Sequence, residues 1–199
     1  MTSSSRQSPA PSFTVPGMKD EVAAELIRLL QQRLHALNDL ALTLKHVHWN
    51  VVGPHFIAVH EMIDPQVDAV RAMIDTTAER IATLGASPQG TPGALVAARS
   101  WDDYSLRRAS TQEHLGALDV VYQGVVTDQR EAIEAVDDLD LVSQDMLIGQ
   151  SDALEMFHWF VRAHLEDKGG NVASSGASTE KGAAKKVAAR TAKKATKKS

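Results

Sequence analysis

The segment HFIAVHEMID, residues 55–64, carries an imidazole and a carboxylate one helical turn apart. His60 and Asp64 have the i, i+4 spacing that places two side chains on the same face of a helix. His48 lies upstream in KHVHWN, and Asp75 and Glu79 repeat the one-turn spacing in DTTAER. Imidazoles and carboxylates with open positions suit a non-haem ferrous ion, and they also accept Mn or Zn. These five side chains are therefore candidate metal ligands.

The spacing of the two pairs argues against a site within one chain. Asp64 and Asp75 are separated by about 16 Å along a helix that rises ~1.5 Å per residue. Bonds from a metal to its ligands are only ~2.0–2.2 Å long. The pairs can meet if a second subunit packs its copy of this helix antiparallel across a twofold axis. His60 and Asp64 of one chain would then face Asp75 and Glu79 of the other.

Other interpretations of these residues remain open. A histidine beside an apolar stripe can be a core or interface residue, and Asp75 with Glu79 can form a solvated face. Pro65 could begin a helix with Asp64 as its N-cap, which would spoil the stripe. A di-iron centre inside one chain needs two Glu-x-x-His elements and two further glutamates. Only Glu155-Met-Phe-His158 fits that pattern, so such a centre is disfavoured.

A bundle of helices must position these side chains. The chain of 199 residues is 43% hydrophobic but only 5% aromatic, which favours helices packed on helices. Apolar residues recur at three- and four-residue steps over residues 19–52, 56–84, 100–136 and 143–166. Ser100 with Asp103 resembles a capping box at the start of the third stretch. His48, near the end of the first helix, could lie beside His60 across the short turn.

The lengths of the connections predict an all-α, ferritin-like four-helix bundle with one long crossover. The segment 85–100 can run the length of a bundle, and ALVAAR within it can form a short helix. We expect residues 1–18 to form a flexible arm, 19–167 the bundle and 168–199 a disordered Lys/Ala-rich tail.

Composition excludes several classes of protein. The chain has no cysteine, which rules out thiol catalysis, disulfides and cysteine-based zinc sites. No apolar run is long enough to span a bilayer. The first residues lack the apolar block of a secretory signal, so we expect a cytoplasmic protein. The net charge of −4 hides a division, because the last 19 residues hold eight cations and every one of the 25 acidic residues precedes them.

HVHWNVVGPHFIAVHEMID, followed by DTTAERIATLG, resembles the signature of the Dps proteins, the DNA-binding mini-ferritins of starved cells. The resemblance extends over residues 20–167, including WDDYS and FHWFVRAHLE, and the basic tail is similar to that of mycobacterial members. It implies a hollow dodecamer with ferroxidase sites between twofold-related helices. The implied activity is oxidation of Fe²⁺, preferably by hydrogen peroxide, with storage of ferric iron and protection of DNA from oxidative damage.

The resemblance also assigns residues. His48, His60 and Asp64 match the ligands from one subunit, and Asp75 and Glu79 match those from its partner. Trp49 matches a position that intercepts oxidising equivalents, although it could equally be a packed aromatic at a helix end. Further on, Asp140 and Asp145 resemble the carboxylates of threefold iron-entry pores, although Asp145 could also stabilise a first helical turn.

The basic tail suggests a nucleic acid partner, so we expect the protein to be nucleoid-associated. Clustered cations without acids favour nonspecific contacts with DNA phosphates, and many tails on one shell would add avidity. The alternatives are a solubilising tail and a tail that folds back on the acidic shell. The candidate DNA-binding residues are Lys181, Lys185, Lys186, Arg190, Lys193, Lys194, Lys197 and Lys198.

Two further hypotheses compete with the ferroxidase. One is a structural nucleoid DNA-binding protein whose metal site is vestigial. The other is a plain helical interaction module, which would be a monomer or a small oligomer.

Overall fold

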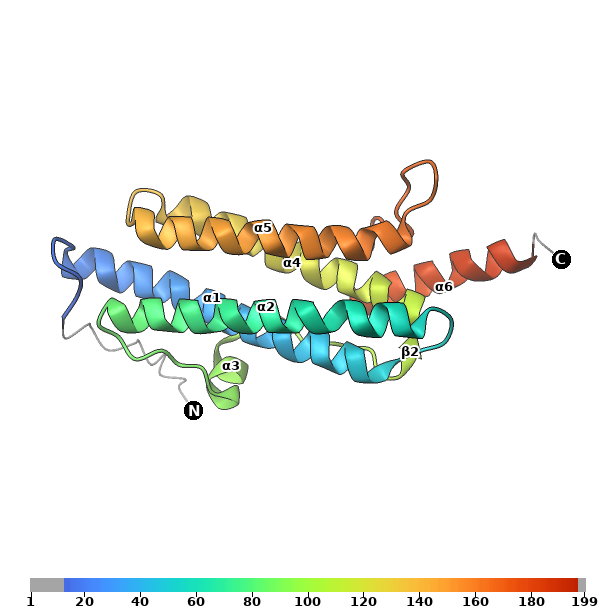
Figure 1. The fold of residues 1–199 in the computed structure, drawn as a ribbon, viewed down its shortest axis with the longest axis horizontal. Coiled ribbons are helices and arrows are strands. Elements are labelled where there is room, and N and C mark those ends of the chain that lie inside the picture. Colours follow the sequence, from blue (N-terminus) through green and yellow to red (C-terminus); the bar gives the residue numbers. More distant parts are fainter. Residues whose placement is uncertain (1–12, 197–199) are drawn as a thin grey trace.

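The protein forms a bundle of four long helices in a computed structural model that describes residues 13–196. The long helices are α1 (Asp20–Asn50), α2 (Phe56–Thr83), α4 (Thr111–Val136) and α5 (Leu141–Leu165). In Figure 1, α1 and α2 lie side by side, as do α4 and α5. Two shorter helices are α3 (Pro92–Ala98) and α6 (Glu180–Thr196). The predicted ferritin-like bundle with one long crossover carrying a short helix is confirmed. Within the described range, no helix combines the length and apolarity that a membrane crossing requires.

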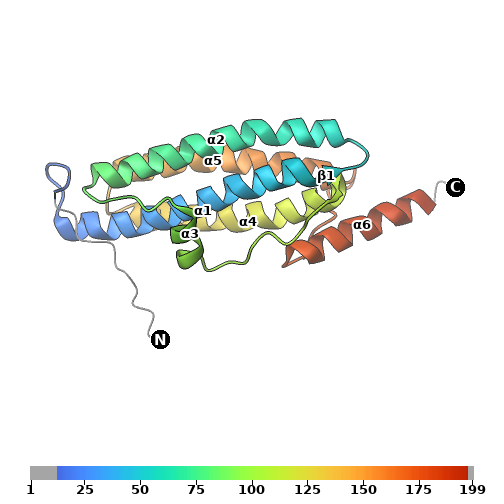
Figure 2. The ribbon, with the colours of Figure 1, turned by 90° about the horizontal axis from the view of Figure 1, so that it is seen from below.

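A tight turn makes α1 and α2 antiparallel neighbours. Gly53 and His55 in this turn have φ angles of 95° and 64°, in the left-handed region that glycine adopts most readily. Between the two helices, β1 (Val51–Val52) pairs in parallel with β2 (Ala109–Ser110) from the end of the crossover. β1 is labelled in Figure 2 and β2 in Figure 1. This two-residue ladder fixes the hairpin that follows His48.

The core consists of the apolar stripes expected from the sequence. Six of the predicted residues of α2 and its end are at most 1% exposed: Val59, Ile63, Val67, Val70, Ile81 and Leu84. They pack against Leu37, Leu40 and Leu44 of α1 and Leu115 and Leu118 of α4, among others. Pro65 lies inside α2, so the alternative in which a helix begins there is wrong. The free energy gained by burying the apolar stripe before and after Pro65 exceeds the cost of the backbone hydrogen bond that a proline inside a helix removes.

The start of the third long helix differs from the prediction. Its capping box is formed by Ser110 and Glu113, not by Ser100 and Asp103, and α4 begins at Thr111. The side chain of Asp103 instead pairs with Arg99. The indole N–H of Trp101 donates to Asp39 of α1 over 2.7 Å, so this part of the crossover lies against the bundle in an extended form. Both stretches carry the Ser-x-x-acid pattern, and only these tertiary contacts decide between them.

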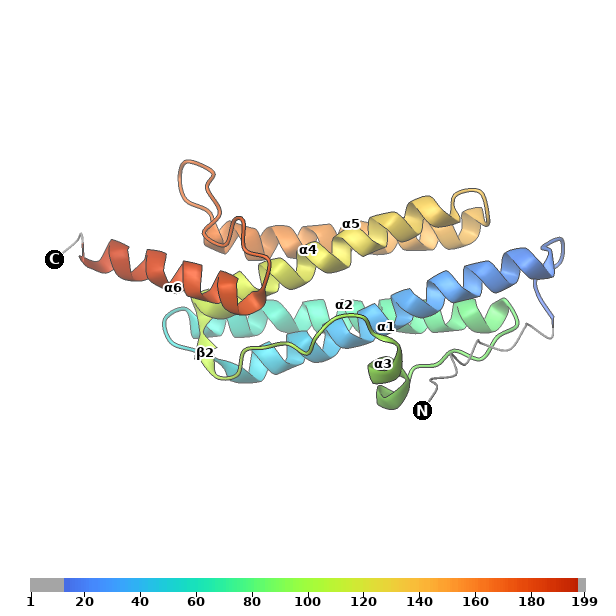
Figure 3. The ribbon, with the colours of Figure 1, turned by 180° about the vertical axis from the view of Figure 1, so that it is seen from behind.

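The predicted disorder of residues 168–199 is wrong for residues 180–196, which form α6. This helix packs against α4, as Figure 3 shows from behind, and buries Ala183, Ala184 and Val187. Small residues suffice because Gly116 of α4 lets the two backbones approach closely. Lys197 and Lys198 lie outside the described residues, as do residues 1–12 of the predicted arm. In the rest of that arm, Val15 and Met18 pack against the start of the core.

Candidate metal centre

His48 and His60 form a stacked pair between α1 and α2. Their ring centroids lie 3.6 Å apart, with an angle of 21° between the ring planes. Nδ1 of His48 is 3.0 Å from the backbone oxygen of His60, and Nδ1 of His60 is 2.9 Å from the backbone oxygen of His48. The antiparallel turn therefore does bring the two imidazoles together, as the sequence suggested.

These reciprocal contacts fix which nitrogen of each ring carries the proton. A backbone carbonyl only accepts hydrogen bonds, so Nδ1 of His48 and Nδ1 of His60 must both be N–H donors. In the neutral ring the lone pair then resides on Nε2, which is the atom that can bind a metal. A carbonyl acceptor behind a histidine is also the usual way in which proteins orient a metal-binding imidazole. The pair is thus prepared for ligation.

Asp64 completes this group on the side of α2. Its Oδ1 lies 3.2 Å from Nδ1 of His48 and accepts a hydrogen bond of 2.6 Å from Nζ of Lys45. The hydrogen bond from Lys45 lowers the pKa of the Asp64 carboxyl, against a smaller opposing effect of burial, and the nearby His48 lowers it further. Asp64 is therefore an anion at neutral pH.

Lys45 was missed by the sequence analysis. It lies one turn before His48 on α1, so the spacing already placed it on the same side of that helix. No sequence pattern pairs Lys45 with a residue of α2. A cation at Asp64 would share the carboxylate with Lys45 or replace it there.

Asp75 and Glu79 are exposed and one turn apart on α2. Among residues 13–196, neither side chain makes a hydrogen bond or an ion pair. The same range contains no group of three or more His, Asp or Glu side chains that could hold a metal ion. One chain therefore brings His48, His60 and Asp64 together and leaves the other pair of carboxylates uncommitted.

The rival intrachain element is engaged elsewhere. Glu155 forms an ion pair of 2.7 Å with Arg130, and Nε2 of His158 lies 2.8 Å from Asp119. Both side chains already have partners, so the structure gives no support to a di-iron centre built on them.

Large apolar side chains lie exposed around the histidine pair. Trp49, next to His48, is 71% exposed, and Ile57, one turn before His60, is 58% exposed. Leu42 is 59% exposed and lies two turns before Trp49 on α1, on the same face of that helix. Exposed apolar groups gathered on one face are typical of a surface that another protein covers. Trp49 is not packed at its helix end within this chain.

The two predicted pore carboxylates have different environments. Asp140 is the N-cap of α5, where it accepts 2.8 Å from the backbone N–H of Ser143 and 2.6 Å from Nη2 of Arg80. Burial alone would raise the pKa of Asp140, but these bonds outweigh it and lower the value. Asp145 is exposed in the first turns of α5. Large exposed apolar side chains occur in the same part of the helix: Leu141, Val142 and Ile148.

Comparisons with known proteins show the family to which the chain belongs. The sequence matches the ferritin-like domain family over residues 27–168. It is 62% identical over 176 residues to the DNA protection during starvation protein of Mycolicibacterium smegmatis, covering 88% of this chain and 96% of that protein. The solved structure of Mycobacterium smegmatis Dps superposes with a TM-score of 0.84, over 86% of this chain and 98% of that one, at 62% identity. DpsA14 from Streptomyces coelicolor is 65% identical, with a TM-score of 0.82 over 83% and 99% of the two chains. The chain therefore belongs to the ferritin-like family and, within it, to the Dps proteins.

Proposed function

We propose that this protein is a Dps-type ferroxidase that works as a dodecamer and also binds DNA. In each twofold-related pair, His48, His60 and Asp64 of one chain bind Fe²⁺ together with Asp75 and Glu79 of the other. The observation that carries this proposal is the oriented imidazole pair on a face with exposed apolar side chains. Asp75 and Glu79 can serve as the remaining ligands, because neither carboxylate has a partner among the described residues.

The residues suit the charge change of the reaction. Hydrogen peroxide takes one electron from each of two ferrous ions and two protons from the solution, its O–O bond breaks, and the products are two ferric ions and two water molecules. Three carboxylates, from Asp64, Asp75 and Glu79, stabilise the added positive charge by short-range attraction. The ferric product is then stored as mineral inside the shell. Trp49, beside His48, is placed to give up an electron to excess oxidant.

Iron reaches the cavity, in this proposal, through threefold pores at the start of α5. Asp145 is the carboxylate there that is exposed and can attract hydrated Fe²⁺ by its field. Asp140 has a supporting part, because its capping bond and its ion pair with Arg80 hold the end of the helix.

A mixing experiment tests the shared site directly. His48→Ala/His60→Ala and Asp75→Asn/Glu79→Gln should each abolish rapid oxidation when anaerobically loaded Fe²⁺ is treated with peroxide. If the two variants are coexpressed at equal levels, about half of the dimers are mixed, and each mixed dimer regains one intact site of two. We expect about a quarter of the wild-type rate. Glu61→Gln, an exposed carboxylate of α2 outside the proposed set, is the matched control and should keep the full rate.

Recovery of activity on mixing would exclude a site within one chain, and no recovery would support such a site. If each chain held a complete site, mixing two inactive variants would restore nothing. The native mass of the assembly must also be that of twelve chains, since a monomer would eliminate the shared centre.

DNA protection in the cytoplasm, at the nucleoid, is the second half of the proposal. The basic tail gives it support, because eight cations follow the last acidic residue. Deleting residues 168–199 should abolish a gel shift with duplex DNA and leave iron oxidation intact. A structural nucleoid protein with a vestigial metal site would bind DNA but oxidise iron no faster than buffer.

A further inference from the structure

The helical form of α6 divides its cations between two sides. Ala183, Ala184 and Val187 face α4 and are buried. At 100° per residue, Lys186 and Arg190 lie one turn apart beside this docked face. Lys181 and Lys185 are also one turn apart, on the flank of the helix away from Lys186 and Arg190, and Lys185 lies nearly opposite the docked face.

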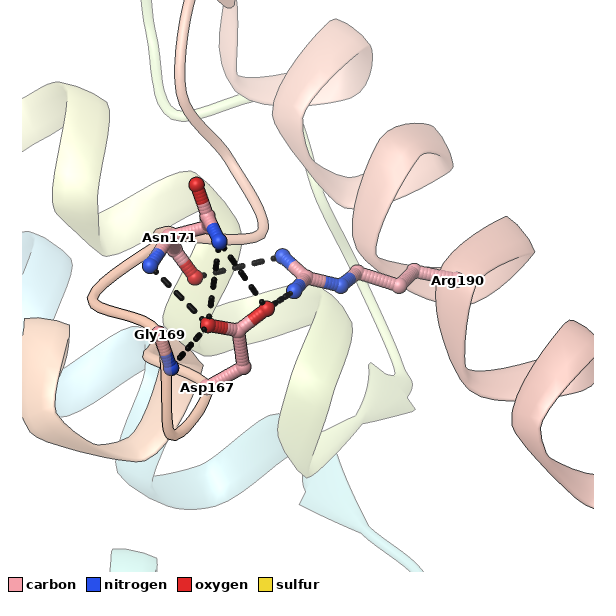
Figure 4. Close-up of polar contacts among 4 residues, drawn as sticks. All are labelled: Asp167, Gly169, Asn171 and Arg190. Carbon is pink, nitrogen blue, oxygen red and sulfur yellow. Dashed lines mark hydrogen bonds and ion pairs between the residues drawn. The ribbon is translucent and has the colours of Figure 1, made fainter.

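Arg190 is held by the loop that precedes α6, as Figure 4 shows. Its Nη2 forms an ion pair with Oδ2 of Asp167, and its Nη1 donates to the backbone oxygen of Asn171 over 3.2 Å. The other oxygen of Asp167 accepts the backbone N–H groups of Asn171 and Gly169, at 3.0 and 2.9 Å. These bonds, the one from Asn171 first, lower the pKa of Asp167. Arg190 therefore faces a fixed anion.

Lys186 is bound to the same loop, and the loop itself is anchored. Nζ of Lys186 donates to the backbone oxygen of Ser175 over 2.7 Å. The neighbouring Ser174 donates through Oγ to Asp119 of α4 over 2.6 Å, and the second oxygen of Asp119 binds His158 of α5. Two cations of the tail thus hold α6 to a loop that is tied to the bundle.

Lys181 and Lys185 are exposed, and neither makes a hydrogen bond or an ion pair in the part of the chain that the structure describes. In Figures 1 to 3, α6 starts beside α4 and runs out past the end of the bundle. Lys181 and Lys185, which form the outer face of α6, lie in its first two turns, where the helix starts beside α4.

We propose that, of these four cations of α6, only Lys181 and Lys185 contact DNA phosphates, while Lys186 and Arg190 serve to dock the helix. This inference rests on the proposed DNA binding and says which cations perform it. The physical reason differs for the two docking cations. Arg190 is already paired with a carboxylate, so it displaces no additional counterion from DNA, whereas Nζ of Lys186 is held against the loop by the backbone oxygen of Ser175. Each true phosphate contact changes the slope of log K against log salt by about 0.9.

The test uses the full-length assembly and a duplex of random sequence, with the dissociation constant measured between about 50 and 200 mM salt. Lys181→Gln/Lys185→Gln should reduce the slope by about 1.8 for each engaged tail. Lys186→Gln/Arg190→Gln should leave the slope unchanged. Both variants remove two positive charges from the same helix, so each is the matched control of the other.

Asp167→Asn should change the salt slope in the opposite direction to Lys181→Gln/Lys185→Gln. Freed from its anion, Arg190 gains a phosphate contact, and the slope should steepen by about 0.9 for each engaged tail. Binding should tighten at low salt, and Asp167→Asn/Arg190→Gln should return to the wild-type slope. A requirement for α6 only as a docked scaffold would instead make Asp167→Asn weaken binding.

The outcomes separate this inference from the function on which it rests. An equal reduction of the salt slope in Lys181→Gln/Lys185→Gln and in Lys186→Gln/Arg190→Gln would show that the four cations contribute equally. That result would overturn the assignment of separate roles but leave the proposed DNA binding intact. A wild-type protein that shows no salt-dependent binding at all would refute both.

Discussion

Gly116→Ala should release α6 from the bundle. A Cβ at position 116 would lie 2.8 Å from Cγ2 of Val187 and 3.3 Å from backbone atoms of Ala183. Valine is stiff at χ1 and the helix backbone cannot give way, so the two helices must separate. Such overpacking costs about 1–3 kcal/mol.

This cost is comparable to the free energy that docks α6. Burial of the Val187 side chain contributes roughly 2 kcal/mol, and the methyl groups of Ala183 and Ala184 roughly 0.8 kcal/mol each. Most of the stability of a helix in a protein comes from tertiary packing, and the 17 residues of α6 only slightly exceed the ~12–15 below which isolated helices are marginal. Release from α4 therefore also unfolds much of α6. A loss of about 2 kcal/mol corresponds to a roughly 30-fold increase in the open population. The alanine also raises the helix propensity of α4, but it does so equally whether α6 is docked or open.

Hydrogen exchange of the α6 amides, read by mass spectrometry on the native assembly, measures this opening. We expect protection over residues 183–191 to fall roughly 30-fold in Gly116→Ala. Gly124→Ala is the matched control, because no atom lies within 4 Å of a Cβ at that position of the same helix. It should leave α6 protected and stabilise the bundle by about 0.5–1 kcal/mol. Wild-type protection in Gly116→Ala, or an equal loss in Gly124→Ala, would refute the close-approach argument.

Three further predictions concern buried polar contacts. The hydroxyl of Tyr122 donates to Gln66 over 2.6 Å in the core, so Tyr122→Phe should cost about 1–3 kcal/mol in chemical denaturation by leaving the amide oxygen unpaired. Asp140→Ala removes the cap of α5 and should cost about 1–2 kcal/mol, read as a lower melting temperature. Burial opposes ionisation of Asp119, but bonds from His158 and Ser174 outweigh it and hold its pKa below the ordinary 3.8. Its contribution to stability is therefore complete above that pH and is lost as pH falls through the lowered pKa. Exchange of loop 166–178 should rise below pH 3.8 in the wild type. The rise should be smaller in Asp119→Asn, where Asp167 is the carboxylate with a lowered pKa that still holds the loop.

The parts of the fold that the sequence predicted depend on contacts between chain neighbours. The apolar repeats of α1 and α2 determine which faces meet, and the short turn leaves only an antiparallel arrangement. His48 and His60 are only about one turn from that hairpin on either side, so their register follows from the turn. The proximity of the two histidines was therefore predictable.

The features that were missed depend on contacts between distant segments. The start of α4 could not be chosen by local pattern, because Ser100 and Ser110 both begin a Ser-x-x-acid sequence. The order of α6 depends on Gly116, which lies more than 60 residues before it and carries no side chain to mark the contact. A Lys/Ala-rich segment with few large apolar residues is predicted from its sequence to be disordered unless a close-packing partner is known.

The two halves of the proposed centre differ in how far one chain prepares them. His48 and His60 are already oriented by each other's backbone, so binding a metal costs them little conformational entropy. Asp75 and Glu79 are exposed and unpaired among the described residues, and a glutamate side chain loses up to about 2 kcal/mol when it is fixed. This loss of side-chain entropy is offset either by the contacts of a docked second subunit or by the binding of iron itself. Affinity for Fe²⁺ should therefore weaken when the dimer interface is weakened, even with every ligand in place. Ferrous titration of Trp49→Ala beside the wild type measures this, and an unchanged affinity in an assembly that dissociates more easily would contradict the shared centre.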